Sequence, residues 1–403
     1  MHKIRSFFLC CIFSTAVVLA QTDPDLEKRI EEIIALVTDS KLDAAVSKAS
    51  ELVAAHPHSY EAHRTAFQTN FEAFRGNPDG PDGSFQLETA LKRLDYLRRL
   101  APLSYEAWEL SLSFWNPARL NPRPQNPETV QLLAEAEGFL GGSETEKAVE
   151  ALHEVIQKEP GYAPAHLSLG EIYFSRGEYA EALRFAEAAT EKDRGDPVGF
   201  LLLARAHAML GDSEEAIRNL IHSLEADPSY PPAWQLMTQL DLGGTNVEHM
   251  ALHFPKPVLW AIDQGIEEPN EEDLQELSEV SRGAWRAYIA AKVQFQKVTW
   301  RRESELQFYR YSFREELTAI IDLLLIWTEI SASNPEAEDV LLDHWLAASD
   351  AGAVDVAIFV DFFLEQNRHD FTMWKLEYPG KFEEYFYKFV LPRASSLNTR
   401  PGG

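Results

Sequence analysis

Two histidines have the one spacing in this chain that resembles a metal site. His249 and His253 are four residues apart, and Glu248 precedes the first. On a helix, that spacing would place both imidazoles on one face, as zinc ligands require. The zinc-protease motif has its glutamate directly after the first histidine, however, and here Pro255 interrupts the helix soon after the second. We therefore favour capping or core histidines over metal ligands, and we expect no metal and no cofactor.

Other catalytic arrangements are absent from the sequence. There is no Gly-x-Ser-x-Gly nucleophile motif, no phosphate-binding glycine loop and no dinucleotide fingerprint. We therefore predict that the chain is not an enzyme. The alternative is a site within the C-terminal region, which would require a buried cluster of titratable residues in a cleft. The candidates for such a cluster are Glu248, His249, His253 and His344.

A basic and aromatic stretch is the other candidate for chemistry. Between 285 and 314, aromatic residues are interleaved with lysines and arginines. As a binding site, the stretch would offer positive charge and stacking faces to an acidic peptide, a glycan or a polyanion. As a structural feature, its aromatic side chains would pack inward while its basic side chains pair with the acidic residues of 267–279, and we favour this interpretation. The possible patch consists of Trp300, Arg301, Arg302, Arg310 and Arg314, and carboxylate partners for its arginines would decide between the two.

The first twenty residues have the pattern of a secretory signal. Lys3 and Arg5 precede an apolar run, and the residues 18–20 would place a cleavage site after Ala20. A membrane anchor is the alternative, although the apolar run is shorter than a bilayer span requires. We expect a secreted or periplasmic protein with no stable membrane span after cleavage. Both cysteines of the chain lie in this run, so packing alone would stabilise the mature fold.

The charge of the chain limits its partners. The 403 residues include 37 lysines and arginines and 64 aspartates and glutamates, a formal net charge of −27. Nucleic acids and anionic lipid surfaces bind proteins chiefly through positive charge, so neither is an expected partner. Hydrophobic residues make up 45% and charged residues 25%, which is ordinary for a folded globular protein.

A repeated pattern indicates which elements would position these residues. Within 163–197, Leu169, Tyr173, Leu183 and Ala186 recur at helical spacing and would bury one face of two antiparallel helices, and Gly170 and Ala182 are small where these helices would approach closely. Gly177, Tyr179 and Ala189 complete the pattern. The pattern starts again 34 residues later, at Pro197, with Phe200, Leu203, Ala204, Gly211, Ala216 and Pro228. Upstream, the second-helix alanine and the closing proline recur as Ala148 with Pro160, Ala90 with Pro102, and Ala45 with Pro57. Two helices cannot bury this face alone, so the pairs must stack.

This pattern resembles the tetratricopeptide repeat, a helix pair with W-x2-L-G-x2-Y in its first helix, A-x3-F in its second and a closing proline. Trp108 and Trp234 occupy the tryptophan position, and His63 and His166 fall where the repeat packs a large side chain. The resemblance implies an all-α fold: a right-handed α-solenoid followed by a C-terminal helical region. The domains are then a signal peptide (1–20), an array of about six units (21–240), a helical domain (241–392) and a flexible tail (393–403).

After 240 the repeat pattern fails. The strongly apolar residues 317–330 predict a helix that is buried. The stretch 337–364 is interpreted as a degenerate helix pair whose core residues are Trp345, Phe359, Phe362 and Phe363. The aromatic residues of 371–389 end the folded part.

The family resemblance also implies a function. In such arrays the first helices build a concave face that binds an extended peptide or a partner helix, which implies an exported scaffold or adaptor that binds a protein. Residues of the first helices that packing does not need would point into this groove: Arg64, Gln68, Glu109, Glu171, Phe174, Arg205, Gln235 and Gln239. The clamp with which some members hold a C-terminal carboxylate is not matched, since Leu167 and Leu201 stand at its early lysine position. The alternative is an accessory or catalytic envelope protein whose C-terminal domain has its own site.

Overall fold

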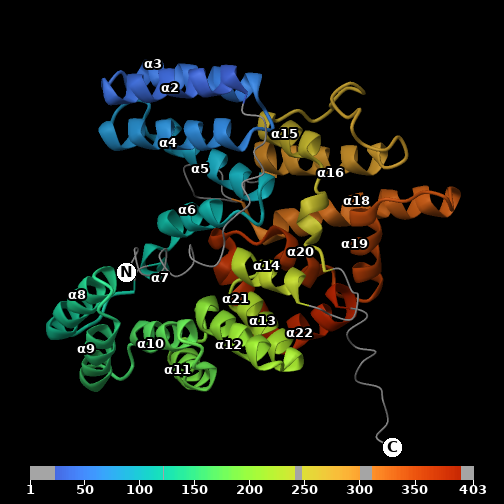
Figure 1. Cartoon of the computed structure of the whole chain (residues 1–403). Coiled ribbons are helices and arrows are strands. Elements are labelled where there is room, and N and C mark those ends of the chain that lie inside the picture. Colours follow the sequence, from blue (N-terminus) through green and yellow to red (C-terminus); the bar gives the residue numbers. More distant parts are fainter. Residues whose placement is uncertain (1–22, 121, 241–246, 300–310, 392–403) are drawn as a thin grey trace, which may run out of the picture. The chain divides into compact units, whose positions relative to one another are not determined.

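The computed structural model of the chain describes residues 23–120, 122–240, 247–299 and 311–391 (Figure 1). Every regular element in these ranges is a helix or a helical turn, and they contain no strand. This confirms the predicted all-α class. The predicted signal peptide (1–20) and tail (393–403) lie outside the described residues.

Contacts between residues divide the chain into two compact units. Unit 1 has Leu112–Glu248 and the C-terminal residues from Phe382, whereas unit 2 has the residues up to Ser111 together with His249–Lys381. The predicted domains, 21–240 and 241–392, have other bounds and stay predictions. Each unit is described by itself below.

Unit 1 contains the best-preserved part of the repeat. Its helices form antiparallel pairs, α8 with α9, α10 with α11 and α12 with α13, and α11 also packs against α12 (Figure 1). The helices are α7 (Pro117–Leu120), α8 (Pro127–Gly141), α9 (Thr145–Lys158), α10 (Ala163–Ser175), α11 (Tyr179–Lys192), α12 (Pro197–Leu210), α13 (Ser213–Ala226), α14 (Pro231–Gln239) and the turn η4 (Phe386–Val390). Two further helices, α6 (Tyr105–Trp115) and α22 (Lys381–Tyr385), cross the division between the units. Phe386 returns to this unit, with its ring 5.7 Å from that of Trp234 on α14.

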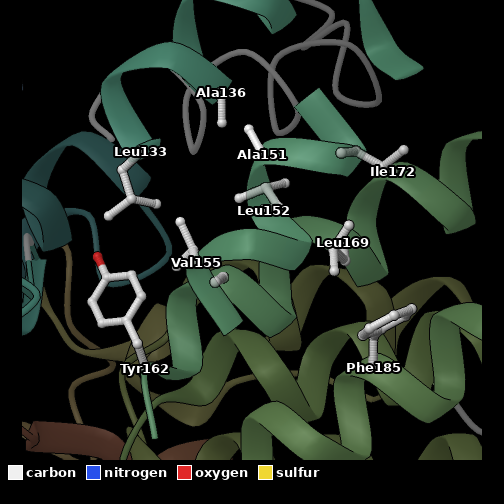
Figure 2. Close-up of a cluster of buried hydrophobic side chains, with 10 residues drawn as sticks. Leu133, Ala136, Ala151, Leu152, Val155, Tyr162, Leu169, Ile172 and Phe185 are labelled. Atoms are coloured by element: carbon white, nitrogen blue, oxygen red, sulfur yellow. The ribbon is translucent and has the colours of Figure 1, made fainter. Parts of the chain in front are cut away.

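The core of unit 1 shows why the repeat needs small residues. A Cβ atom added at Gly170 on α10 would lie 2.8 Å from Cδ2 of Leu202 on α12, which is fully buried. The tightest approach at this glycine is therefore to the next pair, while on α11, the helix that the pattern predicts, the carbonyl oxygen of Ala182 would lie 3.4 Å from the same atom. Figure 2 shows the adjoining cluster, in which Leu152 and Val155 of α9 lie beside Leu169 and Phe185 of the next pair.

The turns between paired helices use backbone conformations that favour glycine. Gly177, between α10 and α11, has φ of 77°, and Gly211, between α12 and α13, has φ of 84°. Residues with a side chain pay a steric cost there, so these glycines fix the turn.

The large residue near the start of a first helix bonds back to the preceding loop. A ring nitrogen of His166 lies 3.2 Å from the carbonyl oxygen of Pro160, and Trp234 donates its indole N–H to the carbonyl of Pro228 at 2.9 Å. His63 in unit 2 makes the same contact with the carbonyl of Pro57 at 2.9 Å. In each case the two residues are six apart, and the packing role predicted for His63 and His166 is confirmed.

Unit 2 combines the first helix pairs with most of the C-terminal helices. The N-terminal part has α2 (Pro24–Thr38), α3 (Leu42–Ala55), α4 (Tyr60–Gly76) and α5 (Gly83–Leu100). The C-terminal part has η1 (Met250–His253), α15 (Lys256–Gln264), α16 (Arg282–Gln294), η2 (Phe295–Thr299), α18 (Phe313–Ser333), α19 (Val340–Asp350), α20 (Val354–Phe362), η3 (Glu365–Asn367) and α21 (Arg368–Glu377). Since α15 packs against both α5 and α16, the two parts share one core.

Tryptophans with carboxylate partners organise the C-terminal part of unit 2. The fully buried Trp327 donates its indole N–H to Asp343 at 2.9 Å, and Trp345 donates to Asp361 at 2.8 Å. A buried indole N–H needs an acceptor, and in both cases the acceptor is an aspartate on the next helix. The predicted core residues Trp345, Phe359, Phe362 and Phe363 are all buried.

The prediction of a buried helix at 317–330 is wrong for one of its faces. Helix α18 covers these residues, but Leu325 is 62% exposed and Ile321 is 45% exposed. The opposite face, which includes Leu323 and Trp327, is buried. An apolar composition does not determine which face of a helix is exposed to solvent, because folded surfaces contain many apolar side chains.

Candidate functional site

Three of the predicted groove residues form one cluster on the first helices of neighbouring pairs. Glu171 and Phe174 lie on α10, and Arg205 lies on α12. One nitrogen of Arg205, Nη1, donates to Oε1 of Glu171 at 2.8 Å and lies 3.1 Å from Oε2. The guanidinium carbon also lies 4.2 Å from the centre of the Phe174 ring, a cation–π geometry. We call these three residues the Arg205 cluster.

The Arg205 cluster is held away from most of the solvent. The side chains of Arg205 and Glu171 are 15% and 16% exposed. Burial raises the pKa of Glu171 above its usual value, although Arg205 acts in the opposite direction. The Nη2 atom of Arg205 is buried and has no hydrogen-bond partner in the part of the chain that the structure describes. The cluster therefore combines an arginine that has one hydrogen-bonded and one unbonded terminal nitrogen with an aromatic ring. Such a pair can contact a ligand in which a polar group lies next to an apolar group.

The remaining predicted groove residues are divided between the two units. In unit 2, Arg64 makes ion pairs with Glu61 at 2.6 Å and with Glu106 at 2.9 Å. Of the others, Gln68 is exposed and Glu109 is half-buried, and in unit 1 Gln235 is half-buried and Gln239 is exposed. The structure thus brings together Glu171, Phe174 and Arg205, and these carry the candidate site.

The basic aromatic stretch is described only in part. Trp300, Arg301, Arg302 and Arg310 lie outside the described residues, whereas Arg314 lies on α18. Nearer the start of the stretch, Arg286 pairs with Glu271 at 2.6 Å and Lys297 pairs with Glu267 at 3.1 Å. For these two residues, the predicted pairing with the acidic stretch 267–279 is confirmed.

The metal-like histidines take the structural role that the sequence favours. His249 is 3% exposed, and its Nδ1 atom accepts the backbone N–H of Ala251 at 3.1 Å, which caps the short turn η1. Burial and the charge of Arg98 lower the pKa of His249 to about 3, so it is neutral. Glu248 is exposed, and His253 ends the turn. Across the described ranges, no group of three or more His, Cys, Asp or Glu side chains is placed to hold a metal.

A buried ionic cluster in unit 2 is the site feature that sequence reasoning missed. Lys292 on α16 lies 3.0 Å from Glu316 on α18 and also pairs with Glu315 at 2.5 Å. Arg99 on α5 donates to Glu316 at 3.0 Å, and Tyr288 donates its hydroxyl to the same carboxylate. Lys292 and Arg99 hold the pKa of Glu316 down at about 2 despite its burial.

This ionic cluster bears on the catalytic alternative. A buried group of titratable residues exists, but it does not contain Glu248, His249, His253 or His344. Its two carboxylates face two cations, and Glu316 accepts bonds from Arg99, Lys292 and Tyr288. Groups committed to each other in this way stabilise a fold and are poor proton donors or acceptors at neutral pH. The indication of this cluster in the sequence was only weak. Glu315 and Glu316 lie in the first turn of α18, where the helix dipole alone favours acidic residues.

Comparison with known proteins identifies the repeat. Residues 140–200 and 176–240 match the family described as Tetratricopeptide repeat. A relative, the TPR repeat-containing protein YpiA of Bacillus subtilis (strain 168), is 26% identical over 109 residues, which cover 27% of this chain and 26% of that protein. The chain thus aligns with about a quarter of the relative's length. Residues 140–240 therefore contain tetratricopeptide repeats, the family that the sequence pattern indicates.

A structural comparison also finds a tetratricopeptide repeat protein. The crystal structure of the P58(IPK) TPR domain at 2.5 Å aligns with 94% of this chain and 100% of that one, at 14% identity and a TM-score of 0.26. The identification of the repeat rests on the family match and on the helix pairs. Among the helices of the described ranges, none is both long enough and apolar enough to cross a bilayer.

Proposed function

We propose that this chain is an exported tetratricopeptide-repeat scaffold that binds a protein or an extended peptide through the first helices of its repeats. The observation that carries the proposal is the Arg205 cluster, which lies within the residues that match the repeat family. Repeat arrays present the same helix of each pair on one face, so their exposed residues can form one extended binding surface.

The chemistry of the Arg205 cluster supports a peptide ligand. The buried Nη2 atom of Arg205 would have to turn outward to donate to a main-chain carbonyl oxygen, and the Phe174 face would then take an adjacent apolar side chain. The cluster would thus recognise a main chain and one side chain together. Nucleic acid is not a proposed partner, because the formal net charge of the chain is −27.

A C-terminal carboxylate held by a lysine clamp is not the proposed ligand. Leu167 and Leu201 stand at the clamp's early position and are 6% and 4% exposed. Two buried leucines offer neither a charge nor a donor to a ligand.

Export supports a partner in the cell envelope or outside the cell. The apolar run and the small residues before Gln21 are the basis for a signal peptide cleaved after Ala20. N-terminal sequencing of the protein recovered from the envelope or the medium should begin at Gln21. A protein that stays with the cells and keeps its first twenty residues would contradict the proposed export.

The binding proposal is tested by affinity capture with the full chain and two matched arginine variants. Arg205→Ala removes the cation of the cluster. Arg184→Ala is the control, because Arg184 has the same kinds of contact on a second helix: it pairs with Glu181 and lies 4.1 Å from the centre of the Phe185 ring. A partner that is captured by wild type and by Arg184→Ala but lost with Arg205→Ala supports the proposal. A partner retained equally by all three proteins would show that binding occurs elsewhere.

A further inference from the structure

Unit 2 contains a cavity that the proposed peptide surface does not use. It measures about 70 Å³ and lies among α5, α15 and α16, with Tyr311 completing its wall. Leu259 and Ile262 form an apolar side, while Asp95, Arg99 and Gln296 supply polar groups. The volume is suited to a small molecule or to the end of a larger one.

Tyr311, on the wall of this cavity, has a buried hydroxyl group. The residue is 5% exposed, and its hydroxyl has no hydrogen-bond partner among the residues that the structure describes. Burial, with the charge of Glu316, keeps the pKa of Tyr311 well above its usual value, so the hydroxyl is a donor. A buried hydroxyl without a partner is unfavourable, and an acceptor in the cavity would satisfy it.

Arg99 lies over the ring of Tyr311. Its guanidinium carbon lies 4.7 Å from the centre of the Tyr311 ring and 5.3 Å from that of Phe362, and two rings therefore fix its orientation. One of its nitrogens, Nη2, donates to Glu316 at 3.0 Å. Arg99 is also hydrogen-bonded to Tyr288, and a guanidinium has five N–H donors, so the bonds to Glu316 and Tyr288 use only some of them.

Asp95 is the acidic group of the cavity. Its Oδ2 atom accepts the side-chain N–H of Gln366 at 2.9 Å, and burial raises its pKa to about 6. The charged groups that face it come from four helices: Lys92 and Arg99 of α5, Asp263 of α15, Lys292 of α16 and Glu315 of α18. Asp263 is itself paired with Arg93 at 2.9 Å, and Lys292 with Glu315 and Glu316. Asp95 can therefore carry a proton when an anion lies beside it.

We propose that this cavity binds a short aliphatic monocarboxylate, with the carboxylate group at Arg99 and Tyr311 and the hydrocarbon chain against Leu259 and Ile262. The cavity is lined by three basic side chains, those of Lys92, Arg99 and Lys292, and by two acidic ones, those of Asp95 and Asp263, which favours an anionic oxygen ligand over an ammonium group. The apolar side has room only for a short chain. The site is independent of the peptide surface in unit 1.

Binding of the carboxylate is linked to a proton on Asp95. When Asp95 is ionised it repels the ligand, and when it is protonated it can donate a hydrogen bond to the ligand. Affinity for the ligand therefore rises as the pH falls through the pKa of Asp95, about 6. The substitution Asp95→Asn removes the titrating group and with it this pH dependence.

The test is a titration of the full chain with sodium butyrate, followed by ligand-observed NMR at about pH 5.5 and about pH 8, with sodium chloride matched throughout. The proposal expects saturable binding that is tighter at the lower pH. Tyr311→Phe should weaken butyrate binding about tenfold, since it removes one hydrogen bond to a charged group. Tyr96→Phe is the control: Tyr96 also lines the cavity, but its hydroxyl donates to the carbonyl of Pro57, so butyrate affinity should not change.

Three results would overturn the proposal. They are the absence of saturable butyrate binding at both pH values, equal affinity in wild type and Tyr311→Phe, and equal affinity for butyrate and its neutral analogue butyramide. The comparison of butyrate with butyramide uses only the wild-type protein, so it holds even where a variant folds poorly. A pH dependence that survives in Asp95→Asn would exclude Asp95 as the linked group and so contradict the proton-linked form of the site.

Discussion

Arg205 and Glu171 are joined by an ion pair although they occupy the same position in consecutive repeats, 34 residues apart. The bond links α10 to α12, the first helices of two neighbouring pairs. An ion pair between equivalent positions fixes how one pair is placed against the next, and it does so on the face proposed to bind a peptide.

Breaking this ion pair should reduce stability as well as binding. Arg205→Ala leaves Glu171 largely buried without its cation, so we expect the free energy of unfolding to fall by about 2 kcal/mol. Arg184→Ala, whose arginine is 61% exposed, should change it by less than about 0.5 kcal/mol. Urea denaturation followed by circular dichroism measures both. If the double variant Glu171→Ala/Arg205→Ala lost as much as the two single losses added together, the pair would not be coupled.

The close helix approach at Gly170 predicts a penalty for any side chain there. Gly170→Ala places a carbon 2.8 Å from Leu202, which is fully buried and has little room to move, and we expect a loss of about 1–3 kcal/mol. Gly138→Ala is the matched control, because a Cβ atom there would meet nothing within 4 Å on α8. The control should be neutral or slightly stabilising, since alanine favours helix. Thermal unfolding of the two variants compares them directly, and equal melting temperatures would refute the packing argument.

Asp361 should make unit 2 less stable as the pH rises. Burial raises its pKa from 3.8 to about 7, so the folded state holds a proton that the unfolded state has already released. Stability from this group is therefore fully present below about pH 4 and declines as the pH rises to about 7. At about pH 8, Asp361→Asn should be more stable than wild type by up to about 4 kcal/mol, while near pH 4 the two should agree.

The Asp361 effect must be read as a difference between variant and wild type. Burial lowers the pKa values of His63 and His344 to about 4. Their contribution to the free energy of unfolding therefore changes in the opposite direction, since it is lost as the pH falls below 6.5. Urea midpoints of both proteins at several pH values separate the contributions. A variant whose pH profile runs parallel to that of wild type would show that Asp361 is ionised in the folded state.

Glu316 should have the opposite pH dependence. Its pKa falls from 4.5 to about 2 in the folded state, so its contribution is present above about pH 4.5 and is lost as the pH falls towards 2. At neutral pH, Glu316→Gln should cost about 3 kcal/mol, since it leaves two buried cations with one fewer carboxylate. Glu267→Gln breaks an exposed pair with Lys297 and should cost less than about 1 kcal/mol. Equal losses in the two variants would contradict a special role for the buried cluster.

The repeat was predictable from sequence because its causes are local. Gly177 and Gly211 mark turns, and the spacing of Leu169, Gly170 and Ala182 follows from two helices a few residues apart. Helix caps and closing prolines act over similarly short distances. The family match at 140–240 covers the part where these local signals are strongest.

The part of Arg99 in the ionic cluster was not predictable, because Arg99 and Glu316 are 217 residues apart. In the cavity, Asp95 and Gln366 are likewise 271 residues apart. Neither pair has a spacing that could mark it in the sequence, and only the completed fold of unit 2 brings them together. Of the eight predicted groove residues, Glu171, Phe174 and Arg205 lie together in the structure, because the repeat places equivalent positions side by side.

The two units also differ in when they can fold during synthesis. In unit 1, each helix between 127 and 240 packs against helices next to it in the chain, so a pair can close as soon as it has emerged from the ribosome. In unit 2, the partners of Arg99 and Asp95 are Glu316 and Gln366, which are synthesised more than two hundred residues later. Until then the first helix pairs expose the surface that α15 will cover. This interval is when a holding chaperone would act.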